Sequence, residues 1–354
     1  MKKPGQFVLC RKIAASRTAQ RPLPALPHKS ICAIPMPLAY PGPRLMIGRM
    51  MLIDVTTVYS FGEVETAVSN ATSRAELFAD PSFRALLFDR LDSMMPSDGV
   101  LSLDVFDTLL IRDNSSELTR FVEIGECMAQ FLQGKTNRRR RQDKKRVALT
   151  RGGVDAFLAR HLGTKASYRA RDRVKGYGEG SLTEIHTVSS RLLTGTSEAR
   201  DKFIDIELEY ESTRVQPNRL LLDYVERHAE RGGSTILVTD MYMHADQVEN
   251  LLRATGVDPE IFSSVTSSAD ICISKASGLV FPEIESRLGL PASKFLHVGD
   301  SLKGDFRQPM TKGWRALHLP ISVAEIEARR ADHIATADSL KEMFSIIPDI
   351  AMPA

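Results

Sequence analysis

The sequence predicts an α/β fold with a doubly wound parallel sheet and an inserted helical cap. Two short apolar segments, residues 100–103 and 234–238, each end at a polar side chain, Asp104 and Thr239 respectively. Roughly a hundred residues with helical periodicity separate them, and further apolar segments follow at 262–266, 295–298 and 316–319. Open parallel sheets bind ligands at the carboxyl ends of their strands, so we expect the site there.

The composition is that of a globular protein. The chain has 354 residues and 43% hydrophobic content, enough for one large domain or two of ordinary size. It has no run of about 18 apolar residues, so we expect no membrane span. Its four cysteines lack the spacing of a zinc site or a disulfide scaffold, which favours a reducing, cytoplasmic location. The sequence does not indicate an oligomeric state.

The first fifty residues differ from the rest of the chain. They contain nine Lys or Arg, no Asp or Glu, and eight of the eighteen prolines, without apolar periodicity. This composition predicts a disordered basic tail over residues 1–50. It resembles an organelle transit peptide, but we favour translation from Met46, Met50 or Met51, because patterned sequence begins just after these methionines.

The remaining chain divides into four parts. Residues 51–98 form an N-terminal extension, with a strand expected at 51–58 and helix at 74–94. The core covers 99–113 and 233–320, the helical cap 114–232, and a helical tail 321–354. Within the cap, Ser181 and Glu184 have the spacing of a capping box, and Pro217 suits the start of a helix. Gly256 is expected to end a core helix in the left-handed conformation.

A basic segment interrupts the predicted cap. Residues 135–175 contain fifteen basic and three acidic side chains, including the run RRRRQDKKR from Arg138 to Arg146. We favour a solvated helix face or loop. The alternative is a surface that attracts a polyanion or nucleic acid, although few aromatic residues are interleaved to stack on bases.

Polar groups follow four predicted strands or loops in a fixed order. They are Asp104 in DVFDTLL, Thr239 in ILVTDMYM, Lys275 in SKASGLVF, and Asp300 with Asp305 in HVGDSLKGDF. This order resembles the haloacid dehalogenase-like (HAD) hydrolase superfamily, whose members have a Rossmann-like core. The DVFDTLL and TDMYM segments resemble a subgroup of predicted hydrolases that is often associated with glycosyltransferases, which hints at a sugar phosphate or a nucleotide-type substrate.

The resemblance implies a Mg²⁺-dependent phosphatase that forms an aspartyl-phosphate on Asp104. Asp104, the backbone carbonyl of Phe106 and Asp300 would bind Mg²⁺, and Asp305 would support them, because this ion takes oxygen ligands. Lys275 would supply positive charge, and Thr239 would donate a hydrogen bond to a phosphoryl oxygen. The partner would be a small phosphorylated substrate, with further contacts from the residues beside these motifs: Thr108, Asp240 and Ser301.

Phe106 departs from the phosphatase pattern, in which a second Asp two positions after the nucleophile transfers protons. A phenyl ring cannot do so. We favour proton transfer by Asp107 or by a cap carboxylate. A dehalogenase, which lacks the second Asp and works without metal, and a binding protein without turnover are the alternatives. In the cap, the KGYGEGS string suits a turn or hinge, and its Glu179 could contribute to substrate specificity.

Overall fold

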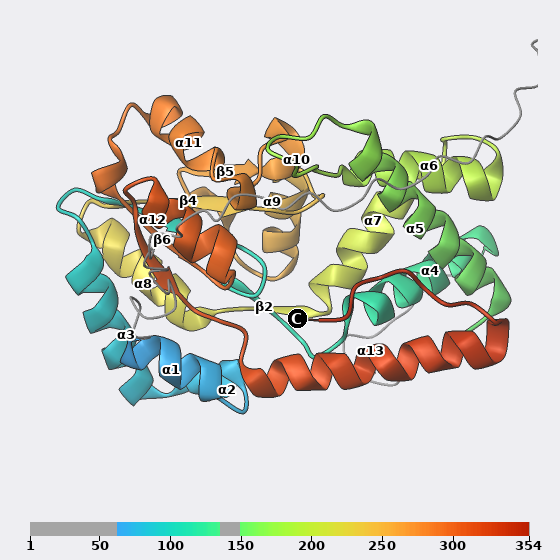
Figure 1. Ribbon diagram of the computed structural model, residues 1–354, viewed down its shortest axis with the longest axis horizontal. Coiled ribbons are helices and arrows are strands. Elements are labelled where there is room, and N and C mark those ends of the chain that lie inside the picture. The colour runs from blue at the N-terminus through green and yellow to red at the C-terminus, as the bar shows by residue number, and fades with distance from the viewer. Residues whose placement is uncertain (1–61, 135–148, 354) are drawn as a thin grey trace, which may run out of the picture. The chain divides into compact units, whose positions relative to one another are not determined.

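The core is a parallel sheet of five strands in the order β5-β4-β1-β6-β7 (Figure 1). The computed structural model describes residues 62–134 and 149–353, so the predicted tail, the strand at 51–58 and the basic run Arg138 to Arg146 lie outside it. The strands are β1 (Val100–Leu103), β4 (Ser234–Thr239), β5 (Ser264–Ser267), β6 (Phe295–Gly299) and β7 (Arg315–His318). The predicted fold class is confirmed, with strand ends differing from the predicted ones by one or two residues.

Side chains that alternate along the strands build two separate apolar layers, because successive residues of a strand point to opposite faces. Val100, Ile236 and Phe295 pack on one face with Trp314. Leu101, Leu237 and Leu296 face the other layer. The flanking core helices are α8 (Arg219–Glu230), α9 (Ala245–Ala254), α10 (Ser268–Ile271), α11 (Val280–Leu288) and α12 (Gln308–Thr311).

Within the described residues, the helical module inserted after β1 has four helices: α4 (Glu117–Leu132), α5 (Arg151–Ala170), α6 (Leu182–Thr194) and α7 (Arg200–Ser212). They pack on one another beside the core (Figure 1). The predicted N-cap at Ser181 is present, since its side chain accepts a hydrogen bond from the Glu184 amide. Gly256 has the expected left-handed backbone, with φ of 83°.

A two-stranded antiparallel ribbon joins this module to the core, and the sequence did not predict it. Its strands are β2 (Leu110–Arg112) and β3 (Val215–Pro217). Pro217 therefore ends a strand, and Asn218 caps the helix that follows. Because α8 packs on β4 of the core, the inserted module ends near Ser212, before the predicted boundary at residue 232.

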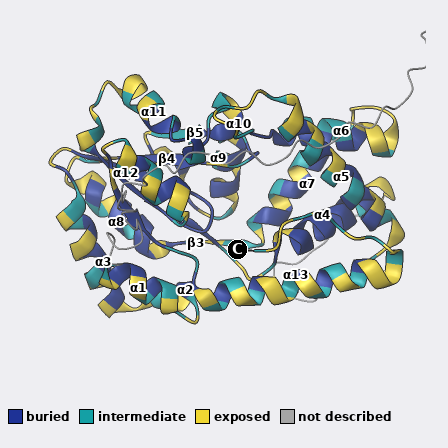
Figure 2. Ribbon diagram, in the orientation of Figure 1, coloured by how far each residue is buried: buried dark blue, intermediate teal, exposed yellow. Residues whose placement is uncertain are grey.

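Segments from both ends of the described chain pack against the core. The N-terminal helices are α1 (Glu63–Asn70), α2 (Arg74–Ala79) and α3 (Pro81–Met94), and the C-terminal segment is one long helix, α13 (Val323–Phe344). Helix α13 runs from α2 to the inserted module (Figure 1). Its Glu325 binds Arg74 of α2, and its Asp332 accepts a hydrogen bond from the Ser116 amide at 2.9 Å. Helix α13 therefore contacts both the N-terminal helices and the inserted module. Its buried residues recur every three or four positions and form one stripe, while much of its visible surface is exposed (Figure 2). No helix among the described residues is long and apolar enough to cross a membrane.

Candidate active site

Asp104 lies directly after β1, where the chain leaves the centre of the sheet. Its amide donates to the Val298 carbonyl of β6 at 2.9 Å, which fixes its backbone against the neighbouring strand. The Thr108 hydroxyl donates to its Oδ2 at 3.0 Å. Burial raises the pKa of this carboxyl, and nearby Lys275 opposes that rise. The carboxylate is therefore fixed in place with few rotational alternatives, as a nucleophile requires.

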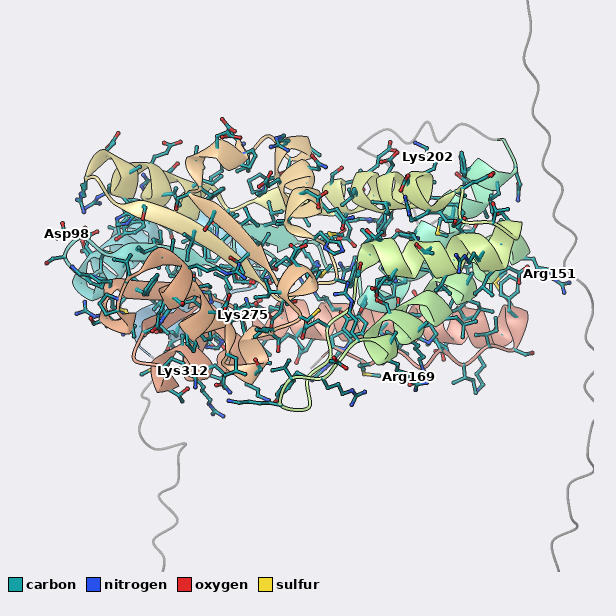
Figure 3. All side chains as sticks on the ribbon, turned by 90° about the horizontal axis from the view of Figure 1, so that it is seen from above. Asp98, Arg151, Arg169, Lys202, Lys275 and Lys312 are labelled. Atoms are coloured by element: carbon teal, nitrogen blue, oxygen red, sulfur yellow. The ribbon has the colours of Figure 1, made fainter. Side chains whose placement is uncertain are left out.

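Lys275 joins two of the predicted carboxylates. It begins the short helix η3 (Lys275–Ser277), and its Nζ lies 2.6 Å from Oδ1 of both Asp104 and Asp305. Burial alone would lower the pKa of Lys275, but these two carboxylates raise it above the ordinary value. The ammonium group thus remains charged beside Asp104. Figure 3 shows Lys275 in the core on the side of the inserted module, whose Arg169 is also labelled.

Three carboxylates converge at this edge of the sheet. Oxygens of Asp104, Asp300 and Asp305 lie within 4.8 Å of one another. Burial, and then repulsion from Asp104 and Asp305, raise the pKa of Asp300 well above its usual range. Burial would also raise the pKa of Asp305, but Lys275 and His297 hold it below that range. Like charges crowded in this way are an environment that a bound cation would stabilise.

Gly299 explains the Gly-Asp pair in this motif. A Cβ atom at Gly299 would lie 2.4 Å from Cγ of Asp305. No side chain fits there without displacing that carboxylate. Asp305 lies in the segment η5 (Leu302–Arg307) and also accepts a hydrogen bond from the Ser301 amide at 2.9 Å.

His297 and Ser102, neither of which is predicted from the sequence, extend the charged cluster into the sheet. His297 Nε2 lies 3.0 Å from Asp305 Oδ1, and its Nδ1 lies 2.8 Å from the Ser102 hydroxyl. Both side chains are fully buried. Ser102 and His297 satisfy each other's hydrogen bonding inside the sheet. His297 also orients Asp305, which in turn pairs with Lys275. The available signal was a polar residue within each of two otherwise apolar strands.

Asp107 does not fit the proton-transfer role expected of it. Its carboxylate accepts hydrogen bonds from Arg74 at 2.9 Å and from both terminal nitrogens of Arg329, at 2.7 and 3.1 Å. Burial would raise its pKa, but Arg329, Arg112 and Arg74 hold it far below the usual range. A carboxylate that stays ionised and bound to arginines has little capacity to donate a proton.

The remaining predicted residues occupy different places around Asp104. Thr239 ends β4 and is buried. Phe106 is buried two residues after Asp104, where its carbonyl remains a predicted ligand. Ser301 caps η5 through the Gly304 amide at 3.0 Å. Asp240, predicted to contact substrate, instead accepts from the amide of Lys275 at 2.7 Å. This bond positions the lysine loop.

A loop of the inserted module contacts the core next to Lys275. Within it, Glu179 is 7% exposed, and burial raises its pKa, an effect partly offset by hydrogen bonding to Ser268 and Ser274. Ser274 immediately precedes the lysine. Tyr177 of the same loop contacts Lys303 of η5, whose Nζ lies 4.5 Å from the ring centroid. The glycine-rich string therefore brings a carboxyl group to the core.

The donor set suits a hard divalent cation. The three converging carboxylates supply oxygen atoms only, and Mg²⁺ and similar ions prefer such ligands. Lys275 balances only one of the three carboxylate charges. The remaining negative charge can therefore hold a divalent cation. Asp104 and Asp300 would be its carboxylate ligands, with the Phe106 carbonyl.

Comparisons with known proteins found similarity in structure alone. No protein-family model and no curated protein sequence matches the chain. Solved structures resemble it: 2-haloacid dehalogenase from Pseudomonas syringae pv. Tomato DC3000 has a TM-score of 0.41 and 16% identity over 62% of this chain and 85% of that one. The putative HAD-hydrolase YfnB from Bacillus subtilis, bound to magnesium, has a TM-score of 0.39 and 15% identity over 70% and 99%.

L-2-haloacid dehalogenase from Xanthobacter autotrophicus has a TM-score of 0.38 and 12% identity over 62% of this chain and 76% of that one. The structure itself shows the α/β fold class predicted from the sequence: a parallel core sheet, a helical module inserted after the first core strand, and motif residues gathered at one edge of the sheet.

Proposed function

We propose that this protein is a Mg²⁺-dependent phosphatase that hydrolyses phosphomonoesters through an aspartyl-phosphate on Asp104. The observation that supports this most strongly is the buried cluster in which Lys275 bridges Asp104 and Asp305 while Asp300 lies beside them. Phosphoryl transfer needs charge neutralisation and alignment more than strong basicity. When bound, Mg²⁺ would neutralise charge on the phosphoryl oxygens.

The chain's own residues account for the first step. The Asp104 carboxylate attacks phosphorus, a new O–P bond forms, and the bond to the leaving oxygen breaks. Lys275 balances the negative charge beside the nucleophile, and Thr239 would donate a hydrogen bond to a phosphoryl oxygen. In the second step water attacks phosphorus, which releases phosphate and regenerates the Asp104 carboxylate. Each step needs a proton moved, to the leaving oxygen and then from water.

Glu179 is our candidate for these proton transfers. It is buried on the loop that contacts the core next to Lys275, and this burial raises its pKa, which suits a group that must both donate and accept a proton. Asp240 also has a raised pKa of about 6, owing to removal from water opposed by Lys275. However, its oxygens accept from the amides of Lys275 and Ala276 at 2.7 and 3.3 Å. We therefore assign Asp240 a positioning role.

The test is phosphate release from aryl phosphates and sugar phosphates, with Mg²⁺ and after chelation, by wild type and by Asp104→Asn. We expect Mg²⁺-dependent turnover by wild type and none by the variant. Glu179→Gln should lower kcat by roughly 10²-fold or more, whereas Glu198→Gln, at an exposed Glu of the same module, should not. Equal rates for wild type and Asp104→Asn would refute the proposal.

A dehalogenase is the second candidate, because the aromatic Phe106 occupies the position of the missing acid. With a buried phenyl ring in place of that carboxyl group, a phosphatase lacks its usual proton carrier. Halide release from 2-haloacids without metal distinguishes the two functions. The acidic cluster beside Asp104 favours the phosphatase.

A further inference from the structure

Arg112 lies between the two loops that carry Asp104 and Thr239. Its guanidinium stacks over the Phe106 ring, with Cζ 4.2 Å from the centroid. Its NH2 group points at the sulfur of Met241, 3.9 Å away. Phe106 is two residues after the nucleophile and Met241 is two residues after Thr239. Because β1 and β4 are adjacent parallel strands, this guanidinium contacts the segments that follow both of them.

The charge of Arg112 is weakly paired compared with its neighbours. Its nearest carboxylate, Asp107, is 3.5 Å away and already accepts hydrogen bonds from Arg74 and Arg329. The next, Glu211, is 4.0 Å from Nε and receives Arg120 on both oxygens, each at 3.2 Å.

Part of the hydrogen-bonding capacity of Arg112 is also unused. Its Nε is buried and makes no hydrogen bond to any described residue. The thioether that NH2 faces is a weak acceptor. A guanidinium has five donors in a planar fork that matches a carboxylate or a phosphate, so a guanidinium with weakly used donors near a site is suited to an anionic group. The side chain is 12% exposed, so part of it remains open to solvent.

We propose that Arg112 binds a second anionic group of the substrate, so that the protein acts on phosphomonoesters that also carry a carboxylate or another phosphate. This inference rests on the proposed phosphatase function, since the first phosphate is assigned to Asp104 and Lys275. The second group would displace the weak contact with Met241 and form charge-assisted hydrogen bonds with the guanidinium. Arg112 thereby selects substrate, and the stacking on Phe106 fixes its plane.

The test compares matched probes that differ in one anionic group. The carboxylate arm uses meta- and para-carboxyphenyl phosphate against phenyl phosphate, and the phosphate arm uses hydroquinone bisphosphate against hydroxyphenyl phosphate. For wild type, kcat/KM should be about tenfold or more higher for the doubly anionic member of at least one arm. The arm with the larger ratio identifies the second group.

Variants separate recognition from structure. Arg112→Met should bring that ratio to about one, and Arg112→Lys should restore part of it, because a lysine keeps the charge but not the planar fork. Arg84→Met is the matched control: Arg84 also stacks on a phenylalanine, 4.5 Å from the Phe88 centroid, but lies on α3, and its variant should keep the wild-type ratio. A fall in rate with an unchanged ratio in Arg112→Met would overturn the inference.

A binding measurement keeps the two proposals separate. Calorimetric titration of wild type and Arg112→Met with the same probes reports the affinity ratio without turnover. Turnover that depends on Asp104 but shows no preference for doubly anionic probes would refute the role of Arg112 and leave the phosphatase standing. Absence of any turnover, with an affinity preference that Arg112→Met removes, would refute the phosphatase and support the anion site.

Discussion

Replacing Asp107 by asparagine tests the buried ion-pair cluster that holds the nucleophile loop. The carboxylate receives two hydrogen bonds from Arg329, at 2.7 and 3.1 Å, and one from Arg74 at 2.9 Å. Arg74 keeps a second carboxylate, Glu325, whose Oε2 lies 2.5 Å from its Nε. Arg329 is left without a close carboxylate among the described residues.

The expected loss of unfolding free energy follows from the difference, among the described residues, between Arg74, which keeps a carboxylate, and Arg329, which does not. Breaking a buried pair by removing one partner costs about 3 to 5 kcal/mol, because a buried charge is left uncompensated. Asparagine can still accept one arginine hydrogen bond, so we expect the low end, about 3 kcal/mol of unfolding free energy. Asn also tolerates the left-handed backbone at Asp107, where φ is 61°. Backbone strain should therefore add little.

The assay is urea unfolding followed by the fluorescence of the single tryptophan, Trp314, which stacks on Phe295 inside the core. With a denaturant slope near 3 kcal/mol per molar, the midpoint should fall by about 1 M. Asp98→Asn is the matched control, because Asp98 is exposed, has φ of 52°, and lies on the core away from the inserted module (Figure 3). A loss no larger than that of Asp98→Asn would refute the reasoning.

Three further predictions concern the charges of the site. Lys275→Met should reduce kcat/KM by roughly 10²-fold or more, measured with the best aryl phosphate, since the positive charge beside Asp104 is lost; a rate near wild type would contradict this. Asp300→Asn should raise the Mg²⁺ concentration needed for half-maximal activity, and an unchanged titration curve would argue against Asp300 as a ligand. The difference in unfolding free energy between wild type and Asp107→Asn should have its full value above pH ~4, the ordinary pKa of an Asp in the unfolded chain. It should shrink as the pH falls towards the depressed pKa of Asp107, because a carboxyl group with a lowered pKa in the folded state loses its stabilising contribution on acidification. A difference that grows at low pH would contradict this prediction.

Three motif residues, Asp104, Thr239 and Asp300, could be predicted from the sequence because each one stands at the end of an apolar strand. Asp104 and Thr239 are placed by the strands before them, and the parallel sheet brings their ends together. Lys275 and Asp305 meet Asp104 at the same edge. In this part of the chain, local pattern and tertiary position agree.

The arginine cluster could not be predicted in the same way. Arg74 and Arg329 reach Asp107 across separations of 33 and 222 residues, and neither stands in a distinctive local pattern. An isolated arginine on a helix is ordinarily a solvated side chain. Only the packing of the N-terminal helices and α13 against the core shows that these two are buried partners.

The ribbon of β2 and β3 was missed for a related reason. Each strand has three residues, too few to establish a period of two against the helical pattern around them. Pro217 was assigned to a helix start because proline suits that position, but it equally suits the end of an edge strand. The register that pairs Leu110 with Pro217 is a long-range property.

Trapping the covalent intermediate tests the central claim most directly. Wild type mixed with an aryl phosphate and Mg²⁺, quenched in acid within the first turnover and digested, should yield a peptide containing Asp104 that is heavier by one phosphoryl group. Asp104→Asn should yield only the unmodified peptide. Phosphate release by wild type without any modified Asp104 peptide, or with the phosphoryl group on another residue, would contradict the account.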